Sequence, residues 1–148
     1  MKMHWVLGAV FSAATMLGSS TTLYAQDVTR SIWDGVYSSA QADRGKTAYS
    51  SNCEKCHAGS LDGMDEIPGL KGPHFIADWE TQTVAELVTR IRSTMPIDNP
   101  GALSTATVTD VVAYLLQQNQ MPAGSAELSP DAGMAGQIRI NAVKQAAK

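Results

Sequence analysis

The most constraining feature of the sequence is the stretch Cys53-Glu54-Lys55-Cys56-His57, which contains the only two cysteines of the chain. On a helical turn, side chains at positions i, i+3 and i+4 share one face, so Cys53, Cys56 and His57 would point the same way. C-x-x-C-H is the sequence that attaches haem c covalently. The two thiols can reach the two vinyl groups of one porphyrin, and the histidine can then bind the iron. We therefore predict one haem c, covalently bound through Cys53 and Cys56, with His57 as an iron ligand.

Three other uses of a cysteine pair fit the sequence less well. A structural zinc site needs about four ligands, usually from two such pairs. The sequence has no second C-x-x-C, and its other histidines, His4 and His74, are not spaced as a ligand pair. A thioredoxin-like dithiol is expected in a βαβ context, which the sequence pattern does not show. A simple disulfide would not require His57.

The first 25 residues have the organisation of a secretory signal peptide. Lys2 supplies a positive charge, residues 5–17 are mostly apolar, and residues 18–25 are mostly small or polar. This pattern predicts cleavage near Ala25 and a periplasmic location. An uncleaved membrane anchor is the alternative, although the apolar stretch is short for that role.

Hydropathy and charge restrict the partners further. No run of 18 or more apolar residues occurs, so no transmembrane span is expected in the mature chain. The formal net charge is −3 and there is no basic run. A nucleic-acid partner would require a cationic surface, so none is expected.

Apolar periodicity predicts three helices in the rest of the chain. The second covers residues 83–94 and the third residues 104–120. The first starts at Ser39, and one of its faces is formed by Ala42, Gly45, Tyr49 and Cys53. Glycine inside a helix costs about 1 kcal/mol relative to alanine. Gly45 therefore indicates that a second helix approaches closely at that point.

These patterns divide the chain into four parts. They are the signal peptide (1–25), an N-terminal extension (26–38), one domain (39–122) and a C-terminal tail (123–148). Glycine and proline between residues 59 and 73 predict a loop inside the domain. Residues 131–148 of the tail are compatible with one weak helix.

Further positions match a known pattern around the C-x-x-C-H motif. Gly45 and Tyr49 precede the motif on its helix, Tyr114 lies on the last helix, and Pro68-Gly69-Leu70 follows the motif. In these positions residues 40–122 resemble the small monohaem class I cytochromes c. The resemblance implies an all-α class I cytochrome c fold, with about three main helices plus loops wrapped around one covalent haem. It also implies that Leu70 contacts the haem and that the Pro68 carbonyl accepts a hydrogen bond from the proximal histidine, which would orient its ring.

The same resemblance suggests the second iron ligand. Met95-Pro96 is similar to the family's distal methionine followed by proline, and Met95 would complete His/Met ligation. A place in the core is the commoner use of methionine. Met64 lies very near His57, and Met121 lies beyond the third helix. His74 offers the alternative of bis-histidine ligation.

Ligation by His57 and Met95 predicts electron transfer. It leaves no open iron position, and thioether ligation raises the reduction potential. We expect a one-electron carrier in a periplasmic respiratory or dehydrogenase chain, with no catalytic residue. The alternatives are a peroxidase-like enzyme or gas sensor with an open iron, and a haem c subunit of a larger oxidoreductase complex.

Two segments suggest the class of redox partner. Residues 32–37 and 95–101 look similar to those of cytochromes that are paired with quinoprotein dehydrogenases. Similar domains also occur as subunits of haem–copper oxidases. The expected partners are therefore a quinoprotein dehydrogenase or a terminal oxidase.

Several other residues are candidates for the haem edge. Trp79, Arg90 and Arg92 are candidate partners of the haem propionates. The alternative is that Trp79 packs partly in the core and that the arginines lie on a solvated helix face, which is the expectation for Arg92. A ring of lysines could also guide a redox partner to the exposed haem edge, although surface lysines are usually no more than solvated side chains. The candidate lysines are Lys46, Lys55 and Lys71.

Overall fold

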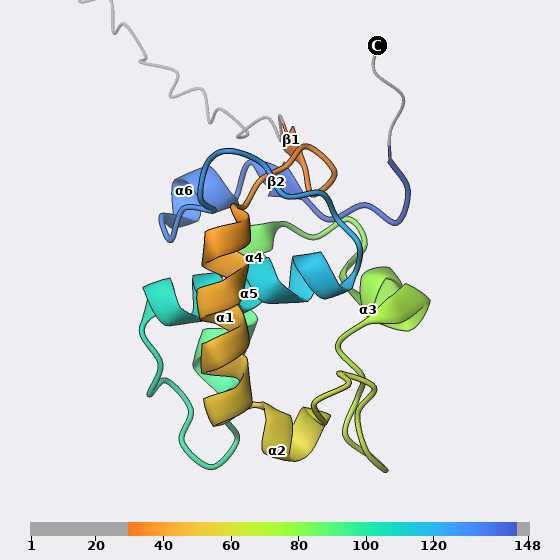
Figure 1. Cartoon of the computed structure of the whole chain (residues 1–148), viewed down its shortest axis with the longest axis vertical. Helices are drawn as coiled ribbons and strands as arrows, with labels where there is room; N and C mark the ends of the chain where they lie inside the picture. The colour runs from red at the N-terminus through yellow and green to blue at the C-terminus, as the bar shows by residue number, and fades with distance from the viewer. Residues whose placement is uncertain (1–29, 145–148) are drawn as a thin grey trace, which may run out of the picture.

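Two long helices cross near the centre of the structure, and the other elements are arranged around them (Figure 1). The computed structural model describes residues 30–144. In chain order its elements are β1 (Arg30–Ser31), α1 (Ser39–Asn52), α2 (Glu54–His57), α3 (Gly72–Trp79), α4 (Val84–Thr94), α5 (Thr105–Gln118), α6 (Ala132–Ala135) and β2 (Ile138–Arg139). Helices dominate, which confirms the expected all-α class. No helix within residues 30–144 is long and apolar enough to cross a membrane.

The crossing of α1 and α5 depends on Gly45. A Cβ atom at this position would lie 1.9 Å from the carbonyl oxygen of Asp110 and 3.0 Å from Cβ of Tyr114. Any side chain would therefore force the two backbones apart. One turn along α1, the rings of Tyr49 and Tyr114 pack with their centroids 5.4 Å apart and tilted by 52°, a geometry that aromatic pairs favour. The predicted close approach of a second helix at Gly45 is confirmed.

Capping residues set the N-terminal ends of the three predicted helices. Ser38, Thr83 and Ser104 accept hydrogen bonds from the backbone at the starts of α1, α4 and α5 respectively. At α4, the Glu86 side chain also accepts from the Thr83 backbone, which completes a capping box. Such caps satisfy backbone N–H groups that have no partner inside the helix. The three helices lie within two residues of the predicted ranges.

Helix α3 was not predicted from the sequence. Its first two residues, Gly72 and Pro73, are typical of a loop, and the helix is only 8 residues long. Proline is nevertheless well tolerated in the first turn, where its missing N–H would be unpaired anyway. Phe75 and Ile76 are buried and attach the helix to the core.

The segments that flank the domain pack together at one end of the molecule (Figure 1). Strands β1 and β2 pair in parallel, with Arg30 opposite Ile138. The side-chain amide of Gln41 on α1 donates to the Leu128 carbonyl (2.9 Å) and accepts from the Leu128 backbone N–H (2.7 Å). The apolar side chains of this layer are buried; they are Ile32, Val36, Tyr37, Met121, Leu128, Ile138 and Ile140.

The weak helix expected over residues 131–148 is wrong for the part that the structure describes. Only Ala132–Ala135 are helical, and β2 follows after two residues. Gly133 and Gly136 weaken the helix, and the backbone around Ile140 pairs elsewhere: its N–H donates to Gln82 (2.8 Å) and its carbonyl accepts from Thr81 (3.1 Å). The predicted signal peptide and residues 145–148 lie outside the described residues.

The contact at Gly45 leads to a stability prediction. Gly45→Ala should lower the free energy of unfolding by about 1–3 kcal/mol, the usual cost of overpacking, although alanine is the better helix former by about 1 kcal/mol. Urea unfolding of the purified protein measures this change. Ser50→Ala, an exposed position in the same helix, is the control and should stay within about 0.5 kcal/mol of the wild type. A Gly45→Ala protein as stable as the wild type would contradict the assigned crossing.

Candidate haem-binding site

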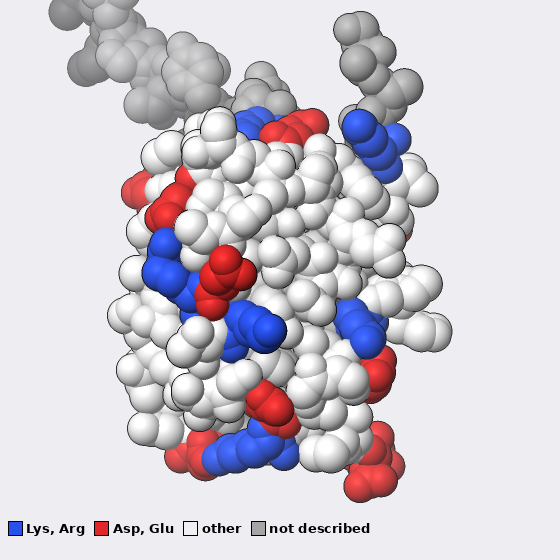
Figure 2. Space-filling model, viewed as in Figure 1, with Lys and Arg blue, Asp and Glu red and all other residues white. Residues whose placement is uncertain are grey.

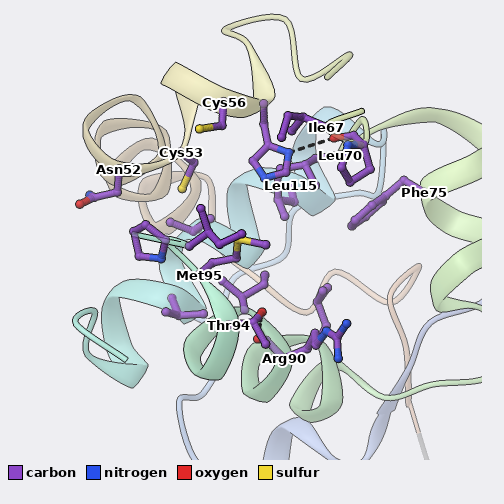
Figure 3. Close-up of a pocket in the computed structure, with 18 of the residues that line it drawn as sticks. Asn52, Cys53, Cys56, Ile67, Leu70, Phe75, Arg90, Thr94, Met95 and Leu115 are labelled. Carbon is purple, nitrogen blue, oxygen red and sulfur yellow. Dashed lines mark hydrogen bonds between the residues drawn. The ribbon is translucent and has the colours of Figure 1, made fainter. Parts of the chain in front are cut away.

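A cavity of about 300 Å³ lies between α2, α3, α4 and α5. Figure 3 shows its lining. The cavity brings together all six residues that the sequence analysis placed at the cofactor: Cys53, Cys56, His57, Pro68, Leu70 and Met95. The rest of the wall is mainly apolar, and includes Phe75, Trp79, Leu87, Ile91, Val108, Val111 and Leu115. Most of the buried apolar wall comes from α4 and α5.

The short helix α2 presents the motif to this cavity. Helix α1 ends at Asn52, and Cys53 accepts backbone hydrogen bonds from Cys56 (3.1 Å) and His57 (3.0 Å). These bonds close a single helical turn, which puts the three motif side chains on one face. Both cysteines are half-buried, and His57 is buried with 9% of its surface exposed.

The His57 ring is oriented by the loop that follows it. Its Nδ1 lies 2.9 Å from the Pro68 carbonyl oxygen, and the dashed line in Figure 3 marks this bond. Because a carbonyl only accepts, Nδ1 is the donor and carries the proton. Nε2 then has its lone pair free for a metal ion. A hydrogen bond of this kind fixes both the tautomer and the ring direction of a metal-ligating histidine.

Tyr49 holds the residue that follows His57. Its hydroxyl donates to the Ala58 carbonyl over 2.6 Å, and Ala58 adopts a positive φ of 63°. Burial raises the pKa of the Tyr49 phenol to about 12, with a smaller contribution from Cys53. The phenol therefore remains protonated at neutral pH and keeps its donor role.

Met95 lies on the side of the cavity formed by α4, across from α2 (Figure 3). It is the C-cap of α4, and its backbone N–H donates to Ile91 (2.8 Å). The alternative ligands lie elsewhere. Met64 is 46% exposed, Met121 is buried at the Tyr37 hydroxyl, and His74 is exposed on α3. None of these three lines the cavity.

The Cys53 thiol differs electrostatically from that of a reactive dithiol. Burial raises the pKa of the Cys53 thiol to about 11, and the neighbouring Cys56 raises it further. Redox-active C-x-x-C pairs instead depend on a thiol whose pKa is lowered. The environment of Cys53 therefore does not favour thioredoxin-like chemistry.

Two of the lysines expected to form a positive ring are in ion pairs. Nζ of Lys55 lies 2.5 Å from Oδ2 of Asp98, and Nζ of Lys71 lies 3.2 Å from Oδ1 of Asp62. The hydrogen bond from Lys55 lowers the pKa of the Asp98 carboxyl. Lys46 is exposed on α1 and does not line the cavity. In Figure 2 most charged side chains lie in small groups in which positive and negative residues are neighbours. Large uncharged areas separate these groups from one another. The expected ring of free positive charge is thus largely compensated.

The two arginines of α4 differ in whether they line the cavity. Arg90 and Trp79 both line the cavity, whereas Arg92 does not, and both arginines are exposed. Sequence reasoning missed Phe75, Asp98 and Ile97, which also line the cavity. For Phe75, the only sequence feature that pointed to burial was the apolar pair Phe75-Ile76. Ile97 and Asp98 carry no local pattern.

Comparison with known families identifies the domain. Residues 40–115 match the family model described as "Cytochrome C oxidase, cbb3-type, subunit III". The chain belongs to this cytochrome c family. It is a class I c-type cytochrome. Such a domain implies haem c and haem-based electron transfer, and Cys53 and Cys56 are consistent with covalent attachment.

Other comparisons add little. No curated protein matches the cytochrome. It is similar to a chain in the crystal structure of the sulfane dehydrogenase SoxCD from Paracoccus pantotrophus, with 17% identity and a TM-score of 0.44. The match covers 76% of this cytochrome and 60% of that chain. This likeness is too low to bear on function.

The Tyr49 hydroxyl leads to a prediction with a matched control. Tyr49→Phe removes the donor to the Ala58 carbonyl and should lower the free energy of unfolding of the holoprotein by about 1 kcal/mol. Tyr114→Phe removes the hydroxyl of the partner ring, for which no hydrogen bond is found within residues 30–144. That variant should change stability by only a few tenths of a kcal/mol. Chemical denaturation of both variants checks the difference, and equal effects would contradict the role of Tyr49.

Proposed function

We propose that this cytochrome carries one electron on a single haem c attached to Cys53 and Cys56, with His57 and Met95 as the two axial ligands. One observation carries the proposal: His57 of α2 and Met95 at the end of α4 line the same cavity, and the Pro68 carbonyl orients the His57 ring. The other candidate ligands, Met64, Met121 and His74, do not line it.

The residues present fit haem c in their chemistry. Two thiols and an imidazole lie on one helical turn, and the cavity wall beside them is mainly apolar. Haem c supplies a reversible one-electron iron couple when it is bound. Leu87, Ile91 and Leu115 contribute apolar side chains to the cavity wall, and an apolar environment would favour the less charged ferrous state of a bound haem.

The choice of ligands favours a carrier over an enzyme. The His57 imidazole and the Met95 thioether would both hold the iron, which would leave no open position for a substrate or a gas. The thioether also raises the reduction potential. Both side chains are held by short-range contacts: His57 by the Pro68 carbonyl, and Met95 by its place at the end of α4. Little rearrangement is then needed when the electron arrives or leaves.

We place this carrier in the periplasm, in a respiratory or dehydrogenase chain. The signal-like organisation of residues 1–25 supports export and cleavage near Ala25. The family model is named for an oxidase subunit, which supports a terminal oxidase as one class of redox partner. The sequence of residues 32–37 and 95–101 supports a quinoprotein dehydrogenase as the other. Such redox encounters bury small interfaces.

Replacement of Met95 tests the proposed ligation. Met95→Ala should keep the covalent haem but open the sixth position, so that the reduced protein binds carbon monoxide. Its reduction potential should fall by on the order of 0.1 V, since axial ligands set haem potentials over a range of about 0.8 V. Potentiometry and absorption spectra measure both effects.

Met64→Ala and His74→Ala are the matched controls, because both side chains are exposed and outside the cavity. Both should retain the wild-type potential and spectrum. An unchanged Met95→Ala protein would assign the sixth position to another ligand.

Arg90 and Arg92 provide a second test on one helix. Arg90 lines the cavity and Arg92 does not, and we propose that Arg90 faces the haem carboxylates. Removing a positive charge near the iron favours the ferric state. Arg90→Gln should therefore lower the potential by on the order of tens of millivolts at low salt, with a smaller effect at high salt. Arg92→Gln should change it much less. Equal shifts in the two variants would show that Arg90 has no special position.

A further inference from the structure

Asn119 connects the last helix of the domain to the loop that carries Pro68. It is the C-cap of α5, and its side chain is half-buried. Its Oδ1 accepts from the Gly72 backbone N–H over 2.9 Å. Its Nδ2 donates to the carbonyls of Leu70 (3.1 Å) and Leu115 (2.8 Å). The Leu115 bond closes the end of the helix, and the other two bonds reach a different segment.

That segment consists of the loop between α2 and α3, residues 58–71, which contains Leu70, and of Gly72, the first residue of α3. Internal bonds shape it: the Leu70 N–H donates to Leu61 (2.8 Å), and Met64 and Ile67 exchange backbone bonds (3.1 and 2.7 Å). Within residues 30–144, its second half is hydrogen-bonded to α2 through the Pro68 carbonyl and to α5 through Asn119. The position of Pro68 therefore depends on anchors at α2 and at the end of α5.

We propose that Asn119 is a positioning residue, which holds the Pro68 carbonyl against Nδ1 of His57 by fixing Leu70 and Gly72. Leu70 lies two residues after Pro68, so a displacement at Leu70 passes directly to the Pro68 carbonyl. The proposal rests on the proposed function, in which His57 ligates the haem iron. Such outer hydrogen-bond partners orient a metal-ligating histidine and raise its basicity. Asn119 would then stabilise the site without contact with the cofactor.

The most direct readout is the Nδ1 proton of His57 in the reduced, diamagnetic holoprotein. Its exchange with solvent, measured by NMR, reports how often the His57–Pro68 bond opens. Asn119→Ala removes both bonds to the loop and should accelerate this exchange about tenfold or more. Asn119→Asp keeps an acceptor for Gly72 but turns a carboxylate oxygen toward the carbonyls of Leu70 and Leu115, and should also accelerate the exchange.

Two controls separate positioning from a purely structural role. Ser104→Ala removes the N-cap of the same helix, since the Ser104 hydroxyl accepts from Thr107 (3.1 Å). It should lower the unfolding temperature but leave the exchange of the His57 proton unchanged. Gln118→Ala alters the exposed neighbour of Asn119 and should change neither quantity.

The outcomes distinguish this inference from the proposed function. If the wild-type holoprotein shows a slowly exchanging Nδ1 proton and the Asn119 variants exchange no faster than Ser104→Ala, the positioning role is overturned. If Asn119→Ala does not mature with haem, the Asn119→Asp protein decides between the same two results. If the same spectra show that His57 of the wild-type protein is not bound to the haem iron, the proposed function itself fails.

Discussion

The backbone contact between α1 and α5 at Gly45 is the constraint on which the rest of the structure depends. With no side chain at this position, the two helices cross in direct contact. The crossing fixes the end of α1, from which Cys53 begins the motif turn. It also places Val108, Val111 and Leu115 of α5 on the wall of the cavity that the motif faces. A single glycine thus sets the distance between the two motif cysteines and much of the apolar wall.

His57 is then held by contacts that come from three parts of the chain. The turn of α2 gives its direction, Pro68 fixes its ring, and Tyr49 holds the residue after it. The electron-carrier proposal requires this rigidity, because a ligand that moves on reduction would slow electron transfer. The site is therefore built chiefly from helix ends and from a short loop that is anchored at several points.

Local patterns predicted the features that are coded locally. The C-x-x-C-H motif, the three longer helices and the glycine at the crossing can each be found within a few turns of sequence. The contact of His57 with Pro68 came instead from a family resemblance, since no physical rule links residues that are 11 positions apart. Helix α3 was missed because a Gly-Pro start is typical of a loop.

The remaining features depend on pairing between distant segments. Strand β2 exists because Ile138 lies beside Arg30, at the other end of the described chain. The ion pair of Lys55 with Asp98 and the bonds of Asn119 to Leu70 and Gly72 likewise join segments more than 40 residues apart. Their residue types are ordinary surface or cap residues. Only the folded structure shows which segments these residues connect.

The absorption spectrum of the wild-type cytochrome, matured in a host that attaches haem c, tests the central claim most directly. It should be recorded in the oxidised and reduced states, with and without carbon monoxide. The account predicts covalent haem, a ferric absorption band of thioether ligation, and no change on addition of carbon monoxide. A strong carbon monoxide shift would show an open iron position and contradict ligation by both His57 and Met95.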